Sequence, residues 1–369
     1  MSNFLYVAPL PIDFNEHNGV TKKILSHIKV FEKYYSTYLL YYYNGYVLLS
    51  HDGLTKRVKK GNNSYAVLKS ISKIGKNFSK VYVRYPKSSP FFISFLKKLK
   101  SSTIVVEIPT YPYDLEGGET FLTRLQRFVD FQYRKKIKKY VSRIVTFSDD
   151  RFIFGIETIK TINGIDFDIT PLSKKIDYNN TFHFIAVSNM YDINGYERLI
   201  MGLKDYYSFT PSHKIIFDIV GDGPARAKYE RIVRELGLEQ YVIFHGLKFG
   251  DELQSLYDRA ILGVNSLAIH RHNLKKESTL KSREYCAEGL LILSSSSVDS
   301  LSVQGNSKFV ISVDANDDVI NVQLLIDSII NVISKYSDSL ALKEAIRNDA
   351  YQICDVNKTL KPVIDYLGE

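Results

Sequence analysis

Short runs of apolar residues alternate with longer amphipathic stretches along the whole chain. In the first part, the apolar runs predict strands at Phe4–Leu10, Tyr35–Tyr43, Val81–Tyr85, Thr103–Ile108 and Arg143–Phe147. The stretches between these runs predict helices at Gly19–Lys33, Ser64–Ile74, Pro90–Lys100 and Thr120–Tyr140. This alternation indicates a parallel sheet with helices on both faces.

A second series with the same pattern follows the polar segment Ser173–Asn180. Its predicted strands are Phe182–Ser188, Lys214–Val220, Tyr241–Phe244, Ala260–Val264, Leu290–Ser294 and Lys308–Val313. Its predicted helices are Gly195–Tyr206, Ala225–Leu236, Glu252–Arg259, Leu280–Glu288 and Val319–Ser334, and two more follow at Ser339–Ala350 and Leu360–Leu367.

The two series predict an α/β protein of two Rossmann-like domains, each built on a doubly wound parallel sheet. We expect the first domain at residues 1–172 and the second at 173–345. The remaining helical segment, residues 346–369, either caps the second domain or crosses back to the first. In this architecture ligands bind at the carboxyl ends of the strands, so the cleft between the two sheets is the expected site.

The composition agrees with two domains and also indicates the cellular compartment. A chain of 369 residues with 45% apolar residues is long enough for two hydrophobic cores. Two cysteines are too few for a disulfide framework, which favours a reducing compartment. The first residues read as a strand rather than a signal peptide, and no apolar run reaches about 18 residues. We therefore expect a cytoplasmic protein.

The formal net charge of +9 indicates an affinity for anionic partners. The excess is concentrated at Lys97–Lys100 and Arg134–Lys139, both in the first domain. Either these clusters are solvated helix faces, or they attract an anionic membrane surface or a lipid-pyrophosphate acceptor. No nucleic-acid-binding module is recognisable, so nucleic acid is not an expected partner.

The segment Ile219–Pro224 ends an apolar strand with the sequence Ile-Val-Gly-Asp-Gly-Pro. Gly221 and Gly223 permit a tight turn and a close approach of the backbone to a ligand, and a helix that begins there directs its amides at anions. The motif lacks the Gly-Lys-Ser/Thr of a phosphate-binding loop and the third glycine of a dinucleotide fingerprint. A purely structural turn is the alternative.

Two further segments could bind anions. In the first, Ser278 and Thr279 precede a predicted helix that starts at Leu280, and Lys281 and Glu284 share one of its faces. Helix amides with Lys281 suit a diphosphate, whereas the alternative is a surface ion pair. In the second, Asn18 and Gly19 follow the first strand, where a glycine turn lets a phosphate or a sugar approach the backbone.

Taken in chain order, these motifs resemble glycosyltransferase family 4, retaining enzymes of the GT-B fold. The quoted segments are the Gly19 turn, Asn163–Asp166, Gly221–Pro224, Leu236–Leu238, Val242–Gly246 and Glu284–Gly289. The resemblance implies a nucleotide-sugar donor with no further cofactor and no metal. It implies transfer of a hexose, with UDP-hexose as the expected donor, to a hydroxyl of a glycan, lipid-linked or protein-linked acceptor.

The resemblance also assigns residues to roles. Lys281 would neutralise charge on the diphosphate, and Glu284 would bind the donor ribose. The other donor-side positions are Asn18, Gly19, Asn189, Asn194, Gly221, Gly223, Ser278, Thr279 and Leu280. The acceptor-side candidates are Arg84, Thr110 and Tyr111.

The chain departs from the family pattern in several respects, the smallest of which is Leu290 in place of a proline after Gly289. Asn189 and Asn194 stand where the family often has arginine and lysine, and Lys276 stands where it often has a first glutamate. The segment Glu107–Asp114 contains no histidine, although many members have one there. These departures leave a catalytically degenerate binding subunit as the alternative function, with an epimerase or phosphorylase behind it. The oligomeric state, and peripheral contact with the inner face of a membrane, stay open.

Overall fold

The computed structural model describes residues 1–369 except 15–18, 114–119, 178–180, 273–275 and 303–306. The chain forms two compact units. The first contains Met1–Asn163 together with Val356–Glu369, and the second contains Gly164–Asp355. The division thus falls between Asn163 and Gly164, ahead of the boundary at 172 that the polar segment suggested.

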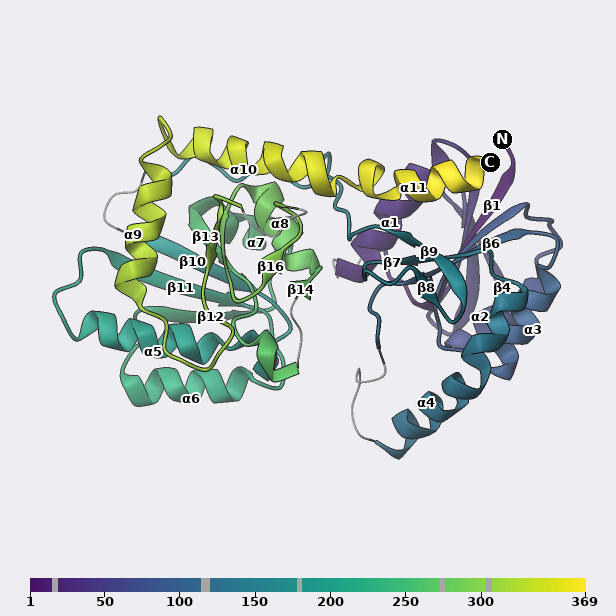
Figure 1. Ribbon diagram of the computed structural model, residues 1–369, viewed down its shortest axis with the longest axis horizontal. Coiled ribbons are helices and arrows are strands. Elements are labelled where there is room, and N and C mark those ends of the chain that lie inside the picture. The colour runs from purple at the N-terminus through teal and green to yellow at the C-terminus, as the bar shows by residue number, and fades with distance from the viewer. Residues whose placement is uncertain (15–18, 114–119, 178–180, 273–275, 303–306) are drawn as a thin grey trace. The chain divides into compact units, whose positions relative to one another are not determined.

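The first unit is built on a nine-stranded sheet with the order β4-β3-β2-β1-β5-β6-β7-β9-β8 (Figure 1). Its strands are β1 (Asn3–Pro11), β2 (Ser36–Tyr43), β3 (Tyr46–His51), β4 (Leu54–Lys60), β5 (Lys80–Arg84), β6 (Thr103–Ile108), β7 (Arg143–Thr146), β8 (Phe152–Ile153) and β9 (Ile156–Lys160). The six central strands, β2, β1, β5, β6, β7 and β9, pair in parallel with their neighbours. At the edges, β3 and β4 on one side and β8 on the other pair antiparallel.

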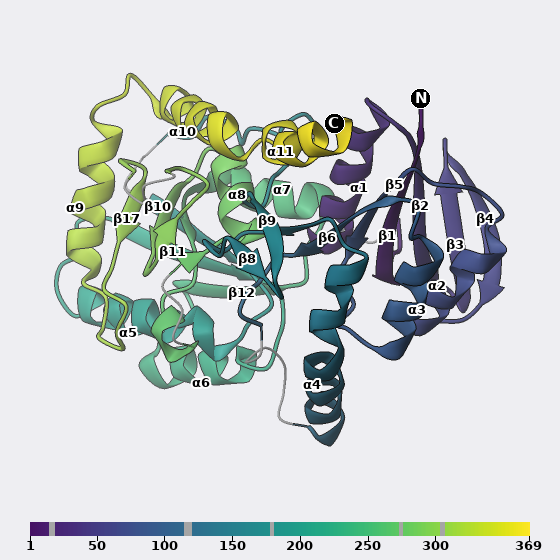
Figure 2. The same cartoon turned by 45° about the vertical axis from the view of Figure 1, so that its right-hand side comes forward.

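Helices cover both faces of this sheet, as the apolar runs predicted. They are α1 (Gly19–Glu32), α2 (Ser64–Ser70), α3 (Pro90–Lys98), α4 (Phe121–Tyr133) and α11 (Val356–Gly368), with short 3-10 turns η1 (Ile71–Lys73) and η2 (Arg134–Lys139). Alternate residues of β1 enter different cores: Leu5 packs with α2 and α3, and Tyr6 packs with α1 and α11. Figures 1 and 2 both show α11 beside α1. The last helix of the chain therefore completes the core of the first unit.

The second unit has a six-stranded sheet with the order β12-β11-β10-β13-β15-β17, in which every pair is parallel. Its strands are β10 (Thr181–Val187), β11 (Lys214–Val220), β12 (Val242–Gly246), β13 (Ala260–Val264), β15 (Leu291–Ser294) and β17 (Val310–Ser312), with a separate pair β14 (Lys276–Glu277) and β16 (Ser297–Val298). Its helices are α5 (Tyr196–Tyr207), α6 (Arg226–Leu236), α7 (Gly250–Arg259), α8 (Leu280–Glu288), α9 (Val322–Ile333) and α10 (Ser339–Cys354), with 3-10 turns η3 (Asp192–Asn194) and η4 (Ile269–His272).

Each unit therefore has the doubly wound parallel sheet that the sequence predicted. In the second sheet the chain order reverses between β10 and β13, and in the first it reverses between β1 and β5. Loops leave such a switch point in opposite directions, which opens a crevice at the carboxyl ends of the strands. The carboxyl edge of each sheet is therefore the expected place for a ligand.

Candidate functional site

The switch point of the second unit lies between the loops that follow β10 and β13. Asn265 and Ser266 directly follow β13 and are buried. Leu267, the next residue, donates its backbone N–H to the Asn194 carbonyl at 2.8 Å, and Ser266 accepts a hydrogen bond from the Lys281 ammonium at 3.2 Å. Residues 265–267 thus connect the loop after β10 with the start of α8, so the structure brings two groups of predicted donor residues to one edge.

The Gly-Asp-Gly turn after β11 packs against the chain itself. A Cβ at Gly221 would lie 2.0 Å from the Ser188 carbonyl oxygen, and one at Gly223 would lie 2.5 Å from the Met190 backbone. Both glycines have a positive φ, of 120° and 147°. The Met190 N–H donates to the Asp222 carbonyl at 2.7 Å, which closes the contact. These glycines therefore allow two loops of the second unit to meet, and that role explains them without a ligand.

Asn189 and Asn194, the two asparagines predicted on the donor side, have different surroundings. Asn194 is buried, and its side-chain oxygen accepts the Tyr191 N–H at 2.7 Å, so it holds the turn η3 in place. Asn189 is exposed, and its side-chain amide donates to the Tyr191 hydroxyl at 3.2 Å. Of this pair, Asn189 is the residue whose side chain can reach a ligand in solution.

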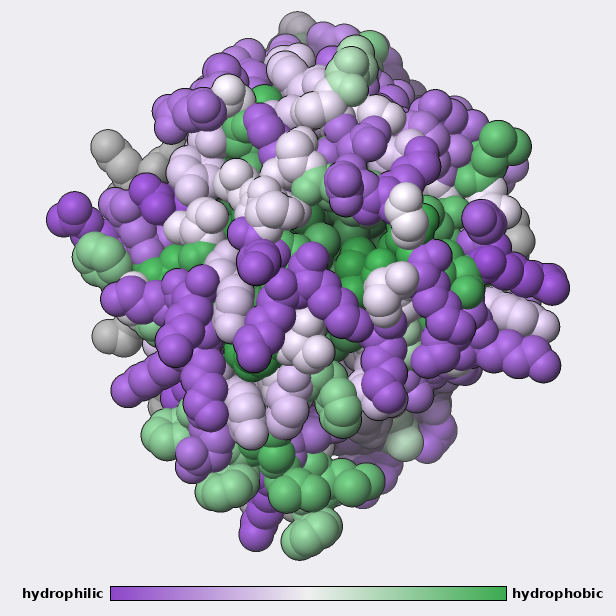
Figure 3. Space-filling view, turned by 90° about the vertical axis from the view of Figure 1, so that its right-hand side faces the viewer, coloured by the Kyte–Doolittle hydropathy of each residue, from purple (hydrophilic) through white to green (hydrophobic). Residues whose placement is uncertain are grey.

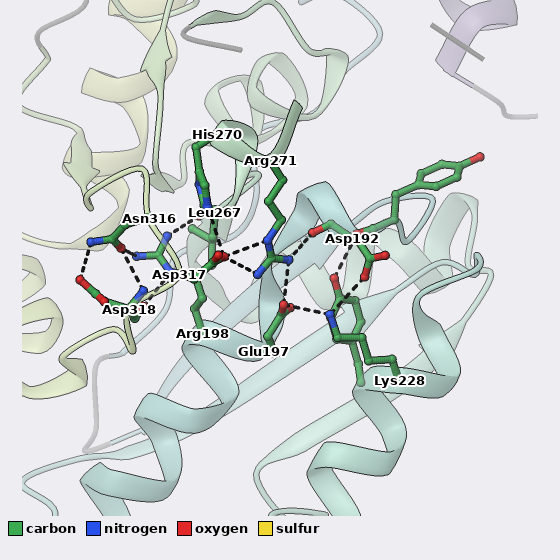
Figure 4. A network of polar contacts seen from close by, with 12 residues as sticks. Asp192, Glu197, Arg198, Lys228, Leu267, His270, Arg271, Asn316, Asp317 and Asp318 are labelled. Carbon is green, nitrogen blue, oxygen red and sulfur yellow. Dashed lines mark hydrogen bonds and ion pairs between the residues drawn. The ribbon is translucent and has the colours of Figure 1, made fainter. Parts of the chain in front are cut away.

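Cations do lie close to this loop, but Arg271 and Lys228 are both paired within the unit (Figure 4). Arg271 binds Asp317 at 2.6 Å and Glu197 at 2.8 Å. Lys228 binds Glu197 at 3.0 Å and Asp192 at 3.1 Å. These residues are scattered over the sequence and each reads as an ordinary surface charge, so sequence reasoning missed the network.

A buried arginine of α5 joins two loops beside this network, the loop after β13 and the loop between β17 and α9. Arg198 is 2% exposed, and its guanidinium donates to the Leu267 carbonyl, to the Asp318 carbonyl at 2.7 Å and to the Asn316 side-chain oxygen at 2.9 Å (Figure 4). Because three oxygens of the unit accept its N–H groups, its position is explained without a ligand. Arg198 is a framework residue for the loop after β13.

Helix α8 begins at Leu280, as predicted, with Thr279 at the N-cap position. Among the described residues the Thr279 hydroxyl makes no capping bond to α8; it approaches the Asn265 side-chain oxygen at 3.5 Å and the Ser282 hydroxyl at 3.4 Å. The N-cap side chain thus does not cover the first-turn amides of α8 in the usual way. Lys281 lies on this turn, so its ammonium group and the N-terminus of α8 provide positive potential at the same end of the helix.

The loop before α8 is held by an arginine that sequence reasoning also missed. Arg283 is fully buried; it donates to the Ser278 hydroxyl at 2.9 Å and to the Thr279 carbonyl at 3.1 Å, and it pairs with Asp299 at 2.5 Å. A charged residue inside a helix normally predicts a solvent-facing position. Here it fixes the two residues that precede the helix.

Glu284 lies one turn further along α8 and is partly buried. Its carboxylate accepts a hydrogen bond from the Tyr257 hydroxyl of α7 at 3.5 Å. Burial and the nearby Glu284 charge raise the pKa of Tyr257 well above 10, so the phenol remains a donor. The next residue, Tyr285, binds the backbone of β10 and β13 and packs on Gly263, which ties α8 to the sheet. Glu284 therefore stands on a rigid element.

The first unit contains a buried charge cluster at the carboxyl edge of its sheet. Glu107 of β6 accepts from Lys23 of α1 at 2.7 Å and from Arg84 of β5 at 3.1 Å. Lys23 also donates to the Asn163 side-chain oxygen at 2.6 Å. Burial by itself would raise the pKa of Glu107, but Arg84 and Lys23 lower it to about 2. The predicted acceptor-side residue Arg84 is thus part of an internal ion pair.

The other first-unit candidates differ in exposure. Thr110 is exposed after β6, and Tyr111 is half-buried against the core, with its ring 5.9 Å from that of Phe154. Gly19 is the first residue of α1. Asn18 lies outside the described residues.

The comparisons with known proteins identify the fold. No family model matches the chain, and no curated protein matches its sequence. Solved structures match along nearly the whole length. A glycosyltransferase from Rickettsia africae is 12% identical with a TM-score of 0.64, over 99% of this chain and 97% of that one. Sucrose-phosphate synthase from Thermosynechococcus elongatus is 11% identical with a TM-score of 0.66, over 100% and 99%.

A third match has ligands. HepE from Anabaena, in complex with UDP and glucose, is 13% identical with a TM-score of 0.63, and each chain is covered completely. At these identities the likeness shows the fold alone: two Rossmann-like domains of the GT-B type. Within the described part of the chain, no helix combines the length and the hydropathy needed to cross a bilayer.

Proposed function

We propose that this protein is a retaining glycosyltransferase that moves a hexose from a nucleotide-sugar, with UDP as the nucleotide, to a hydroxyl acceptor. The observation that carries the proposal is the start of α8: amides that the Thr279 side chain does not cap, Lys281 on the same turn and Glu284 on the next. HepE, which has the same fold, was solved with UDP and with glucose. The family resemblance assigns a diphosphate and a ribose to the corresponding positions.

The proposed contacts follow from charge and reach. A diphosphate carries negative charge that suits both the positive end of a helix dipole and an ammonium group. The Lys281 ammonium donates to the hydroxyl of Ser266, which places it beside the loop after β13 at the carboxyl edge of the sheet. Glu284 would accept hydrogen bonds from the ribose hydroxyls, with Tyr257 holding its carboxylate in place.

The chemistry needs no protein nucleophile. In front-side attack the departing diphosphate accepts the proton of the acceptor hydroxyl, and the new bond forms on the face that the leaving group vacates. The enzyme then acts by orienting both substrates and by stabilising the charge that develops on the diphosphate. Because α8 and Lys281 supply positive potential, the proposed reaction is metal-independent.

The acceptor is proposed at the level of class: a glycan, a lipid-linked sugar or a protein. The first unit would receive it, with Thr110 and Tyr111 as the accessible candidates after β6. Arg84 would act only through Glu107, because its guanidinium is engaged there. A cytoplasmic enzyme in peripheral contact with a membrane suits the lipid-linked class.

The alternative is a degenerate subunit that binds a donor without turning it over. The paired state of Arg271 and Lys228 favours it, because these cations beside the loop after β10 are already neutralised by Glu197 and its neighbours. The arrangement at α8 favours an enzyme. Binding and turnover therefore have to be measured separately.

The test is a donor screen combined with one matched pair of variants. UDP, GDP and ADP are titrated by calorimetry, and transfer or hydrolysis is followed with the corresponding hexose donors. Glu284→Ala should weaken binding of the preferred nucleotide by about 10- to 150-fold, since a charge-assisted hydrogen bond contributes roughly 1.5–3 kcal/mol. The control is Glu235→Ala, which removes an exposed carboxylate of α6 that pairs with Arg231.

The outcomes separate the two functions. Binding with turnover, lost in Glu284→Ala and kept in Glu235→Ala, supports the enzyme. Binding without turnover of any donor supports the degenerate subunit. Equal nucleotide affinity in both variants would remove Glu284 from the site.

A further inference from the structure

Helix α4 has its apolar face on the outside. Five large apolar side chains of this helix are exposed: Phe121 (79%), Leu122 (69%), Leu125 (49%), Phe128 (62%) and Phe131 (60%). Helical periodicity places most of them on one side, since Phe121, Leu125 and Phe128 recur at spacings of four and three. A helix on a globular protein normally shows the opposite pattern, with its apolar side in the core.

The inner side of α4 is polar, and polar contacts fasten it. Asp130 is the residue of this helix that is buried, with 1% exposure. Its carboxylate accepts hydrogen bonds from the Tyr85 and Tyr113 hydroxyls, both at 2.7 Å, and from the Ser88 backbone at 2.5 Å. The outward position of the phenylalanines is therefore fixed by specific bonds on the other side.

The same segment is strongly cationic. From Phe121 to Lys139 its basic residues are Arg124, Arg127, Arg134, Lys135, Lys136, Lys138 and Lys139, against the single buried carboxylate of Asp130. Lys135, Lys136, Lys138 and Lys139 are exposed on η2, which continues α4. An apolar face flanked by arginine and lysine is the pattern of helices that lie in the interface of an anionic bilayer.

Figure 3 shows green, apolar residues gathered at the bottom of the space-filling view. Helix α4 lies at this height in Figures 1 and 2, which differ from Figure 3 by a turn about the vertical axis. Purple, hydrophilic atoms border them. A second copy of this chain is a poorer occupant of the face, because two such helices would bring their arginines and lysines together without compensating carboxylates. In an anionic bilayer, the acyl chains would contact the apolar face of α4 and the head groups would pair with its arginines and lysines.

We propose that α4 docks on an anionic membrane by inserting its apolar face, with η2 contacting the lipid head groups. The docking goes beyond attraction by the basic clusters, because apolar insertion persists when salt screens charge. It extends the proposed function by naming the surface where the acceptor is met, and it depends on that function only for the acceptor's identity. A variant of α4 that loses vesicle binding but keeps its nucleotide affinity would separate the docking proposal from the proposed function.

The chain contains no tryptophan, so one engineered tryptophan reports its own site. Phe128→Trp places the reporter on the apolar face of α4. Phe209→Trp is the control, because Phe209 is 79% exposed just beyond the end of α5 in the second unit. Each protein is mixed with vesicles of phosphatidylcholine alone or with phosphatidylglycerol, and emission is recorded with and without brominated lipid.

We expect a blue shift and quenching by brominated lipid for Phe128→Trp with anionic vesicles, and neither for Phe209→Trp. The triple variant Phe121→Gln, Leu125→Gln, Phe128→Gln should lower the vesicle partition coefficient roughly tenfold or more, because each side chain loses its apolar transfer energy. Replacing the similarly exposed Leu54, Ile169 and Phe209 by glutamine should leave partition within about twofold.

Three results would overturn the proposal. One is vesicle-bound Phe128→Trp protein whose tryptophan emission does not change. Another is vesicle binding that the α4 triple variant retains and high salt abolishes, which would leave charge alone as the cause. The third is absence of vesicle binding together with concentration-dependent dimerisation that the α4 variant removes, which would assign the face to a second copy.

Discussion

The buried charge cluster of the first unit makes a quantitative prediction about acid stability. The side chain of Glu107 is 1% exposed and faces Lys23 and Arg84. Its pKa falls from 4.5 to about 2 because the two cations outweigh the effect of burial. At about 1.4 kcal/mol for each pH unit, this lowering corresponds to about 3 kcal/mol of stability.

The sign follows from the direction of the shift. A carboxylate whose pKa is lower in the folded protein stabilises it above the unfolded pKa and loses that contribution as the pH falls through the folded pKa. The contribution of Glu107 is therefore complete above about pH 4.5 and disappears toward pH 2. Glu107→Gln should destabilise the first unit by about 3–5 kcal/mol at pH 7, since it leaves two buried cations without their counter-charge.

The assay should report on the first unit alone, because global unfolding of a chain with two compact units is commonly not a single two-state transition. Hydrogen exchange of β6 amides, followed by mass spectrometry from pH 7 downward, gives the local opening free energy. The wild type and Glu107→Gln should differ most above pH 4.5 and converge by about pH 2. The control is Glu157→Gln, which removes a partner of Arg143 from a pair with side chains 43% and 33% exposed and should cost under about 1 kcal/mol. A difference at pH 7 no larger than the control's, or one that does not change with pH, would refute the reasoning.

Two further predictions concern the second unit. Transfer activity should survive an excess of EDTA, because α8 and Lys281 supply the positive potential; complete loss that manganese restores would contradict this. Gly221→Ala should lower the stability of the second unit by about 1–3 kcal/mol, because its Cβ would lie 2.0 Å from the Ser188 carbonyl at a φ of 120°. Gly237→Ala is the matched control for thermal melts, since it has a positive φ but no atom within 4 Å, and an equal loss in both would exclude the clash as the cause.

The order of strands and helices could be predicted because the buried strands are predominantly apolar, even where one contains a buried carboxylate such as Glu107 of β6. The runs at Lys214–Val220 and Ala260–Val264 coincide with β11 and β13. The pattern misses the hairpin of β3 and β4 because β4 is largely exposed and contains four cations, so it shows no apolar run. The predicted helix Thr120–Tyr140 also differs: α4 ends at Tyr133 and η2 continues it as a 3-10 turn.

The chemistry of single residues could be predicted less well, because it depends on partners far apart in the chain. The family resemblance places Arg84 toward an acceptor, yet its partner Glu107 lies on the neighbouring strand, and no spacing rule connects the two. Arg283 lies inside the α8 segment and no sequence rule gives it a role, although it is fully buried beneath Ser278 and Thr279. Local motifs thus predicted which loops lie at the candidate site, but they did not predict which residues pair with each charged side chain.

The cations near the switch point of the second unit have different surroundings, and this difference indicates where a diphosphate could be stabilised. Around the loop after β10, Arg271 and Lys228 are both held by Glu197, so a diphosphate there would have to compete with carboxylates already in place. At the start of α8, a cation and the positive end of a helix dipole coincide, and the Lys281 ammonium reaches the hydroxyl of Ser266 beside the switch point. We therefore infer that charge stabilisation in this protein would be concentrated on α8. Lys281→Met should reduce turnover more than Asn189→Ala, and an equal effect of the two on kcat would contradict this inference.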